Sequence, residues 1–152
     1  MEFSNNLIKH IPNHFEFPAY TCYQAACHRN IMVHEELKTI VFKANHEIYA
    51  FHLLGDKKVN YNKIDELKNK AQLLDVYSLG RYDLTKGTIN PFSIKRNLPL
   101  KMVYICKSVF ALEKVYTNDG TLCGTIVFSP TVLRKIYENY SIGRYSEKCN
   151  NF

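Results

Sequence analysis

Two runs in the first half of the chain combine β-branched, aromatic and aliphatic residues with few polar ones. Residues 37–44 (LKTIVFKA) and residues 47–54 (EIYAFHLL) both have this composition, which is typical of β-strands. Only the dipeptide Asn45-His46 separates the runs, and such a short polar gap predicts a β-hairpin. Gly55-Asp56 then predicts a turn that ends the second strand.

A helix is predicted before this hairpin. Thr21 followed by Gln24 has the form of a capping box, which predicts a helix over residues 22–29 with Thr21 as its N-cap and Gln24 reaching back. Asn30 suits the left-handed residue that ends such a helix. Ala25-Ala26 is expected on the side of the helix that packs against the rest of the protein.

A second helix is expected to follow residues 59–61. Ile64, Leu67 and Ala71 are spaced at i, i+3 and i+7, which is the period of a helix with one apolar face. The pattern over residues 73–86 favours no particular element.

The second half of the chain contains three further strand-like runs: residues 101–106, 114–118 and 122–128. The last two are joined at Asp119-Gly120. Ser129 and Pro130 predict a terminal helix, with Ser129 as N-cap and Pro130 at the first helical position. Strands and helices are mixed and no repeat or low-complexity linker divides them. The pattern therefore predicts an α+β fold, with residues 1–152 in a single domain.

Composition supports an ordinary globular chain. Of its 152 residues, 46% are hydrophobic and 22% are charged, which is enough for one well-buried core. No apolar run approaches the roughly 20 residues that span a bilayer, and the N-terminus lacks the features of a secretory signal. The five cysteines are scattered without a C-x-x-C pair, so no disulfide framework is predicted. We expect a cytoplasmic protein.

The chain is basic, with 20 Lys and Arg against 14 acidic residues and a net charge of +6. A basic surface attracts polyanions such as RNA, but a lysine-rich surface that only confers solubility has the same composition. The basic residues cluster in two stretches of the sequence: Lys57, Lys58, Lys63, Lys68 and Lys70, and then Lys95, Arg96, Lys101 and Lys107.

The common signatures of metal and covalent catalysis are missing. Pro12 lies between His10 and His14 and would break a helix that aligned them on a metal ion. The chain has no Walker loop, no G-x-G-x-x-G and no G-x-S-x-G, and no base stands beside Cys22 or Cys123 to activate a thiol. The remaining histidines, among them His52, are isolated and are expected on the surface or on a strand face. We therefore expect no metal and no cofactor.

Three other features are candidates for chemistry. Lys38-Thr39 opens an otherwise apolar strand. Gly87 to Phe92 form a loop in which glycine permits close approach of the backbone to a ligand and Pro91 is excluded from the middle of a helix or central strand. Asn118-x-Gly120 precedes Ser129-Pro130. Each also has an ordinary explanation: an edge lysine, a connecting loop, and a hairpin turn followed by a helix cap.

Taken in order, these features resemble the YbaK/prolyl-tRNA-synthetase-associated (INS-like) family of aminoacyl-tRNA editing deacylases, from about Thr21 to Tyr140. The matching positions are Thr21, Ala25-Ala26, Lys38-Thr39, Gly55-Asp56, Val59, Lys63, Gly87 to Phe92, Asn118 to Gly120 and Ser129 to Leu133. The chain departs from the family in a shorter stretch before Thr21, in Thr88 where many members have a second glycine, and in Asp119 where a small residue is common.

The resemblance implies a mixed, mostly antiparallel sheet, curled into a barrel-like form and flanked by helices. It implies a trans-editing hydrolase that cleaves the ester of a mischarged aminoacyl-tRNA with a water nucleophile. Lys38 would anchor the terminal phosphate or the ester region, and backbone amides at Gly87 and Thr88 would stabilise the oxyanion. The substrate would be bound by Thr39, Thr88, Ile89, Asn90, Pro91, Asn118 and Gly120, and the tRNA acceptor stem by Lys57, Lys58, Lys63, Lys95 and Arg96.

Other functions remain open at this point. A non-catalytic relative that binds tRNA or a synthetase is one alternative, although the intact Lys38 and Gly87 argue against it. A small-molecule hydrolase or a metabolite-binding domain on the same scaffold is another. The expected partners are the tRNA acceptor stem and, as a further candidate, an aminoacyl-tRNA synthetase, with neither DNA nor a membrane. Proline, cysteine, alanine and serine all remain candidates for the amino acid that is removed.

Overall fold

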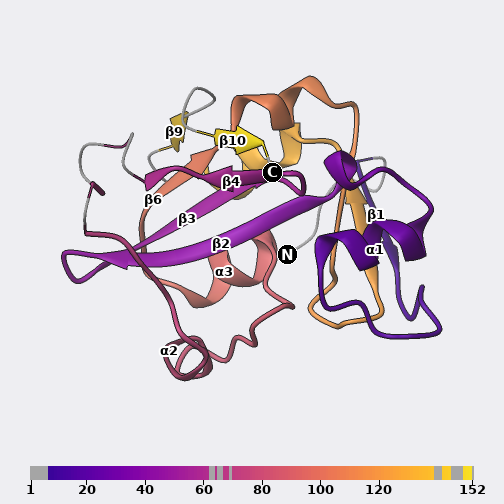
Figure 1. Ribbon diagram of the computed structural model, residues 1–152, viewed down its shortest axis with the longest axis horizontal. Helices are drawn as coiled ribbons and strands as arrows, with labels where there is room; N and C mark the ends of the chain where they lie inside the picture. Colours follow the sequence, from indigo (N-terminus) through magenta and orange to yellow (C-terminus); the bar gives the residue numbers. More distant parts are fainter. Residues whose placement is uncertain are drawn as a thin grey trace.

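The main sheet of the protein has five strands and runs through the middle of the molecule (Figure 1). The computed structural model describes residues 7–61, 64, 67–68, 70–138, 142–144 and 149–151. The sheet order is β5 (Gln72–Leu73), β2 (Leu37–Ala44), β3 (Glu47–Leu54), β6 (Leu100–Ile105) and β9 (Ile142–Arg144).

The predicted β2–β3 hairpin is confirmed with its predicted bounds. Leu37 pairs with Leu54 at one end and Ala44 pairs with Glu47 at the other. The turn residues Asn45 and His46 have φ values of 53° and 66°, the left-handed pair that a two-residue hairpin turn needs to match the twist of its strands. Asparagine tolerates this conformation better than most residues, which explains its place in the turn.

The turn after β3 requires a glycine. A Cβ atom on Gly55 would lie 2.5 Å from the carbonyl oxygen of Val33, closer than real atoms approach. This close approach presses the 3₁₀ helix η1 (Val33–Glu35) against the end of β3, and the Gly55 amide donates to the carbonyl of Glu36 at 2.9 Å. The start of β2, which carries Lys38, is thereby held in place.

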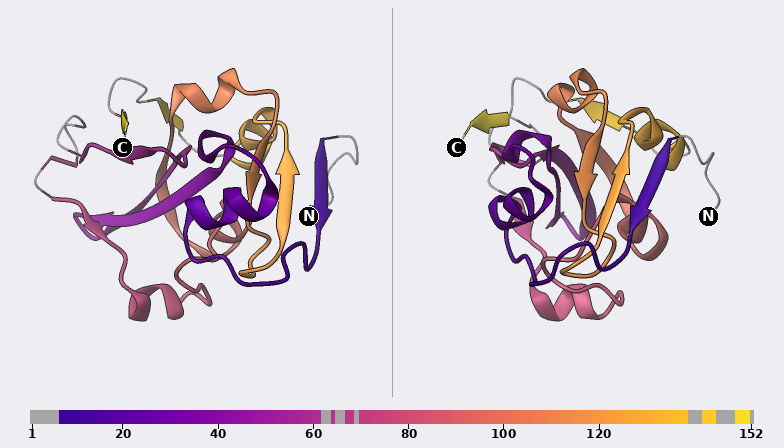
Figure 2. Two further views of the ribbon diagram at one scale, coloured as in Figure 1. Left: turned by 45° about the vertical axis from the view of Figure 1, so that its right-hand side comes forward. Right: turned by 90° about the vertical axis from the view of Figure 1, so that its right-hand side faces the viewer.

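A second sheet packs at the end of the molecule where β2 begins, and its strands run side by side in both views of Figure 2. It consists of β1 (Ile8–Ile11), β8 (Thr125–Phe128) and β7 (Val115–Thr117), all antiparallel. A two-stranded pair joins β4 (Lys57–Val59) to β10 (Cys149–Asn151). The predicted joining of the runs 114–118 and 122–128 at Asp119-Gly120 is confirmed, because β7 and β8 form a hairpin around that dipeptide, although both strands are shorter than predicted.

The expected sheet type is confirmed but its expected closure is not. Most described strand pairs are antiparallel, whereas β3–β6 and β6–β9 are parallel, so the sheet is mixed. Within the described residues the five-stranded sheet ends at β5 and β9 and is not closed into a barrel. Among the residues that the structure describes, its strand pairing with the second sheet is one bridge between Glu36 and Tyr116, which is too little to continue one sheet into the other.

The first helix matches its prediction in its bounds and its caps, and of the predicted Ala25-Ala26 pair, Ala26 is buried while Ala25 is half-buried and lines a cavity. α1 spans Cys22–Arg29, the Thr21 hydroxyl accepts from the Gln24 amide at 3.0 Å, and the Gln24 side chain accepts from the Tyr20 amide at 2.8 Å. Asn30 ends the helix in the left-handed region with a φ of 58°. Figure 1 shows α1 beside the starting end of β2.

The other helices differ from the predictions. The described residues between Tyr61 and Ala71 form successive turns, and residues 62–63, 65–66 and 69 of the expected helix lie outside the described part of the chain. Ile64 and Leu67 are nevertheless buried, as the spacing predicted. Stretches without a prediction contain α2 (Val76–Gly80) and the 3₁₀ helix η3 (Lys107–Ala111).

Pro91 and the terminal helix also need correction. Pro91 starts α3 (Pro91–Asn97) at a first-turn position, where its missing N–H costs nothing, so the loop is shorter than expected. The terminal helix α4 spans Thr131–Ile136 and starts after Pro130, without a capping hydrogen bond from a side chain. Ser129 contributes its carbonyl instead, which accepts from the Val132 amide at 2.9 Å.

Aromatic rings form the centre of the core. The ring of Phe51 stacks on Phe42 at 4.8 Å and on Tyr104 at 4.7 Å, so neighbouring strands β2, β3 and β6 are joined through one row of side chains. Phe42 and Phe51 are fully buried.

Across the described residues, no helix is long and apolar enough to cross a bilayer.

Replacing a ring in this row should destabilise the protein strongly. We expect Phe42→Ala to lower the free energy of unfolding by about 3–5 kcal/mol, because it removes buried apolar surface and leaves a cavity. Urea denaturation followed by circular dichroism measures the change. Phe17→Ala is the control, since Phe17 is 63% exposed and its removal should change the same free energy by less than about 0.5 kcal/mol. Equal effects of the two substitutions would contradict the placement of the core.

Candidate functional site

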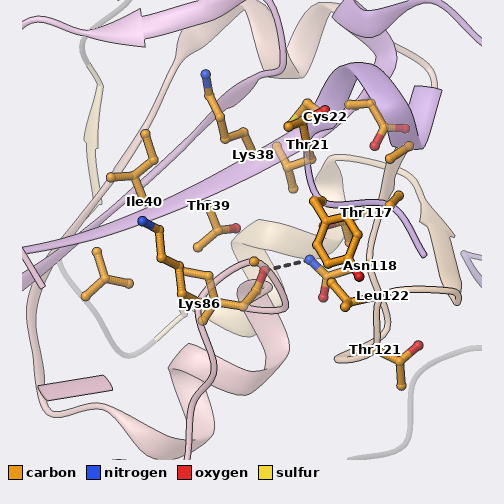
Figure 3. Close-up of a pocket in the computed structure, with 18 of the residues that line it drawn as sticks. Thr21, Cys22, Lys38, Thr39, Ile40, Lys86, Thr117, Asn118, Thr121 and Leu122 are labelled. Carbon is orange, nitrogen blue, oxygen red and sulfur yellow. Dashed lines mark hydrogen bonds between the residues drawn. The ribbon is translucent and has the colours of Figure 1, made fainter. Parts of the chain in front are cut away.

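A large cavity of about 850 Å³ opens between α1, the start of β2, α2 and the loop before α3 (Figure 3). Five segments of the chain that are distant in sequence supply its walls. The polar side chains in its lining are those of Tyr20, Thr21, Cys22, Arg29, Glu36, Lys38, Thr39, Asp75, Lys86, Thr117, Asn118 and Thr121, and Gly87 adds its backbone. The cavity thus joins Lys38-Thr39, Gly87 and Asn118, the three features that the sequence singled out.

Lys38 lies in the cavity wall but its ammonium group is directed away from the centre of the cavity (Figure 3). Its Nζ donates to the backbone carbonyl of Lys57 in β4. The side chain is half-buried, so this contact fixes both the lysine and the neighbouring strand. In this arrangement Lys38 links β4 to the site.

Lys86 is a site residue that the sequence analysis missed. It comes directly before Gly87, and Figure 3 shows its side chain extending from the loop toward the Thr39–Ile40 part of β2. Its position beside the glycine of the loop was the available signal. Lys86 brings a second positive charge to the cavity, on the wall opposite β2.

A buried hydrogen-bond chain connects the two walls. Thr39 Oγ1 lies 3.0 Å from His52 Nδ1, His52 Nε2 lies 2.5 Å from the Tyr137 hydroxyl, and that hydroxyl donates to the Pro91 carbonyl at 3.3 Å. Since Tyr137 donates to Pro91, it accepts from His52 Nε2–H, and His52 Nδ1 accepts from the Thr39 hydroxyl. Burial of the whole ring lowers the pKa of His52 to about 3, so the ring is neutral. The prediction of a surface or strand-face histidine missed this role.

The loop before α3 is held by side chains rather than by regular structure. Gly87 has a φ of 90°, which non-glycine residues rarely adopt. The Thr88 amide donates to the Thr85 carbonyl at 3.1 Å, and the Thr88 hydroxyl donates to the same carbonyl at 3.0 Å. The Thr88 amide therefore already has an acceptor, so it does not fit the expected role of an oxyanion donor. No described residue accepts a hydrogen bond from the Gly87 amide.

Asn118 fastens this loop to the β7–β8 hairpin. Its side-chain amide donates to the Ile89 carbonyl at 2.8 Å, and Asn90 donates in return to the Asn118 carbonyl at 3.1 Å. Asn90 also caps α3, accepting from the Ser93 amide at 2.9 Å. Asn90 and Pro91 are buried and thus support the loop from behind the cavity wall.

An ion pair between Arg29 and Glu36 lies in the opposite part of the wall. Arg29 Nη1 donates to Glu36 Oε1, and the exposed fractions of the two side chains are 2% and 3%. Burial raises the pKa of Glu36 to about 7, although the Arg29 guanidinium opposes the shift. Neither residue was predicted, because a buried pair leaves no local pattern in the sequence.

Covalent catalysis by the cavity thiol is disfavoured. Cys22 lies in the wall, and burial raises the pKa of its thiol, an effect that Glu36 reinforces. A neutral thiol is a poor nucleophile. His52 cannot activate it, since both of its ring nitrogens are engaged by Thr39 and Tyr137. In the described part of the chain, no group of three or more His, Cys, Asp or Glu side chains is placed to hold a metal ion.

The structure divides the predicted residues into two sets. Those that line the cavity are Lys38, Thr39, Gly87, Ile89 and Asn118. Those outside its lining are Thr88, Asn90, Pro91, Gly120, Lys57, Lys58, Lys95 and Arg96. Lys63 lies outside the described residues. The lining also includes exposed hydrophobic side chains that no sequence pattern indicated: Tyr20 is 67%, Leu73 65% and Val76 62% exposed.

Comparison with known proteins gives one family and several similar structures. The family model of the aminoacyl-tRNA editing domain matches residues 16–136. The crystal structure of a hypothetical protein has a TM-score of 0.74 at 21% identity, over 90% of this chain and 89% of that one. A protein described as a candidate trans-editing enzyme for prolyl tRNA synthetase has a TM-score of 0.74 at 17% identity, over 90% and 85%. No curated protein matches the chain.

The neutral state of His52 should make stability depend on pH. In the unfolded chain His52 binds a proton below about pH 6.5, whereas in the folded chain it does so only below about pH 3. His52 therefore lowers the free energy of unfolding as the pH falls from about 6.5 to about 3. Between pH 7 and 5 we expect this loss to be about 2 kcal/mol. Glu36 acts in the opposite direction, because its raised pKa adds stability as the pH falls from about 7.

The His52→Gln variant separates the two effects. Its amide offers a donor and an acceptor but does not titrate, and Glu36 contributes equally in both proteins. Urea denaturation at pH 7 and 5 should therefore show about 2 kcal/mol less acid destabilisation in the variant than in the wild type. An identical pH dependence in the two proteins would contradict a neutral, buried His52.

Proposed function

Since this chain belongs to the aminoacyl-tRNA editing domain family, we propose that it is a trans-editing hydrolase that deacylates mischarged aminoacyl-tRNA in the cytoplasm. The observation that carries the proposal is the single cavity that unites Lys38-Thr39 with Gly87 and Asn118. The structural likeness to a candidate trans-editing enzyme for prolyl tRNA synthetase supports it, as does the match over residues 16–136. We extend the proposal to residues 1–152 as one editing domain.

In the proposed reaction, water attacks the carbonyl carbon of the ester that joins the amino acid to the terminal adenosine. The carbonyl oxygen becomes an oxyanion in the tetrahedral intermediate. The carbonyl then re-forms as the bond from that carbon to the ribose oxygen breaks, and the ribose oxygen takes the proton that the attacking water gives up. The products are the free amino acid and an uncharged tRNA. Because such esters are already activated, positioning and electrostatic stabilisation supply much of the rate without a catalytic triad.

Gly87 is the proposed oxyanion donor of the loop. Its amide has no acceptor among the described residues, whereas the Thr88 amide is bonded to Thr85. The Asn118 contact to Ile89 holds the loop at the cavity, so the donor is positioned before substrate binds. A preorganised donor of this kind stabilises a transition state by about 3–4 kcal/mol in other enzymes.

Thr39 and the two lysines complete the proposed machinery. The Thr39 proton is directed to His52, which leaves the hydroxyl oxygen as an acceptor for the attacking water. Lys38 and Lys86 line the cavity from opposite walls. Their positive charges favour the phosphate next to the terminal adenosine, with Lys86 reaching across the cavity and Lys38 bound to β4.

The tRNA acceptor stem is the proposed ligand of the outer basic residues. Lys58 on β4 and Arg96 at the end of α3 are exposed and lie outside the cavity. Lys57 and Lys95 flank them on the same elements. Contacts of this type bind phosphates without reading the base sequence. An aminoacyl-tRNA synthetase is a further proposed partner.

The deacylation of a panel of mischarged tRNAs tests the proposal directly. The wild type should release the amino acid from at least one of them, and Gly87→Ala should lower kcat about 100-fold, since a side chain disfavours a φ of 90° and displaces the amide. Gly120→Ala is the matched control, because its φ is 94° but it lies outside the cavity lining. Lys38→Ala should also lower the rate. Hydrolysis of simple amino acid esters without hydrolysis of any charged tRNA would refute the editing function.

The proposed phosphate contacts should appear in the salt dependence of tRNA binding. Each phosphate contact contributes about one to the slope of log affinity against log salt concentration. Lys58→Ala and Arg96→Ala should therefore weaken binding and make the slope shallower by about one each. Lys9→Ala on β1 is the control, as Lys9 is exposed but belongs to neither cluster. Fluorescence anisotropy over a range of KCl concentrations measures the slopes, and unchanged slopes would exclude these contacts.

A further inference from the structure

The Glu36 carboxylate has an oxygen that the fold does not use. Oε1 accepts from Arg29, but Oε2 is buried and has no hydrogen-bond partner among the described residues. Glu36 is 2% exposed and belongs to the lining of the cavity. A buried polar atom without a partner costs free energy, so its presence calls for a reason.

Arg29 cannot supply the missing partner. Its Nε donates to the Thr125 hydroxyl at 2.8 Å, and its Nη2 donates to the Thr117 and Gly124 carbonyls at 3.1 and 3.2 Å. The guanidinium is thus fixed by β7 and β8, with one nitrogen left for Glu36. If the ion pair served only to hold α1 against this sheet, nothing would require a buried carboxylate oxygen without a hydrogen-bond partner.

Glu36 is placed beside the residues of the proposed reaction. It stands two residues before Lys38 where the chain becomes extended, so the two side chains point to the same side, and both line the cavity. Its charge also acts on the Cys22 thiol in the same wall. Of the two acidic residues lining the cavity in the described part of the chain, Asp75 is exposed and caps α2. Glu36 is the buried one.

We infer that Glu36 Oε2 accepts a hydrogen bond from the α-ammonium group of the aminoacyl ester, and this inference rests on the proposed function. In its protonated form, every aminoacyl ester carries such a cation on the carbon atom adjacent to its carbonyl carbon. The other charged side chains in the lining are Arg29, Lys38 and Lys86, which repel a cation, and the exposed Asp75, so Glu36 is the buried carboxylate that attracts the ammonium. The terminal torsion of glutamate is soft, and a small rotation turns Oε2 toward the ligand while Arg29 retains its contact. The site thereby selects esters with a free amine over N-acylated ones.

Two non-hydrolysable analogues test the inference without any catalytic step. The first is alanyl-3′-amino-3′-deoxyadenosine, in which an amide replaces the ester, and the second is its N-acetyl derivative. Calorimetry with the wild type should give at least about tenfold tighter binding of the free amine, since a hydrogen bond to a charged group has that effect on affinity. Equal affinities, or no binding of either analogue, would overturn the inference.

Two variants separate recognition from a structural role. Glu36→Gln keeps an acceptor for Arg29 but loses the charge, and should reduce the preference for the free amine to about twofold or less. Asp75→Asn, the matched control, should keep the wild-type preference. A Glu36→Gln variant that weakens both analogues equally would show a merely structural role and overturn the inference. The wild type could instead bind the free amine selectively but hydrolyse no charged tRNA. That result would refute the proposed function and leave this inference standing.

Discussion

The site depends on one buried hydrogen-bond chain that runs from Thr39 through His52 and Tyr137 to the carbonyl of Pro91. It joins β2 to the beginning of α3 through the core, so the two principal walls of the cavity keep a constant separation. Burial holds His52 neutral, and a neutral ring donates from one nitrogen and accepts at the other. A charged ring would donate from both nitrogens and could no longer accept from the Thr39 hydroxyl, which explains why the histidine is buried.

Arg29 has the corresponding role on the other side of the cavity. Its guanidinium contacts two backbone carbonyls and the Thr125 hydroxyl as well as Glu36, and thereby attaches α1 to the β7–β8 hairpin. In the described part of the chain, the two sheets share little direct pairing, with one bridge between Glu36 and Tyr116. Polar contacts of buried side chains therefore determine the shape of the cavity more than strand pairing does.

The chemistry of the cavity follows from what these contacts leave available. Both nitrogens of His52 are engaged, and the Cys22 thiol is kept neutral, so neither suits covalent catalysis. The Gly87 amide and the Thr39 oxygen remain as donor and acceptor. The mechanism that we propose, water attack with backbone stabilisation of the oxyanion, uses these two groups. The chain belongs to the aminoacyl-tRNA editing domain family.

The sequence by itself determined the elements whose signals are local. The β2–β3 hairpin and α1 with its caps follow from strand composition, turn residues and side-chain caps that act within a few residues, and the ordered motifs indicated the family. The tertiary structure decided that Thr88 bonds within its own loop, that Lys38 contacts β4, and that Lys86 enters the cavity. It also decided the open sheets and the burial of Glu36. These features arise between segments distant in the chain, where no local pattern in the sequence records which side chains meet.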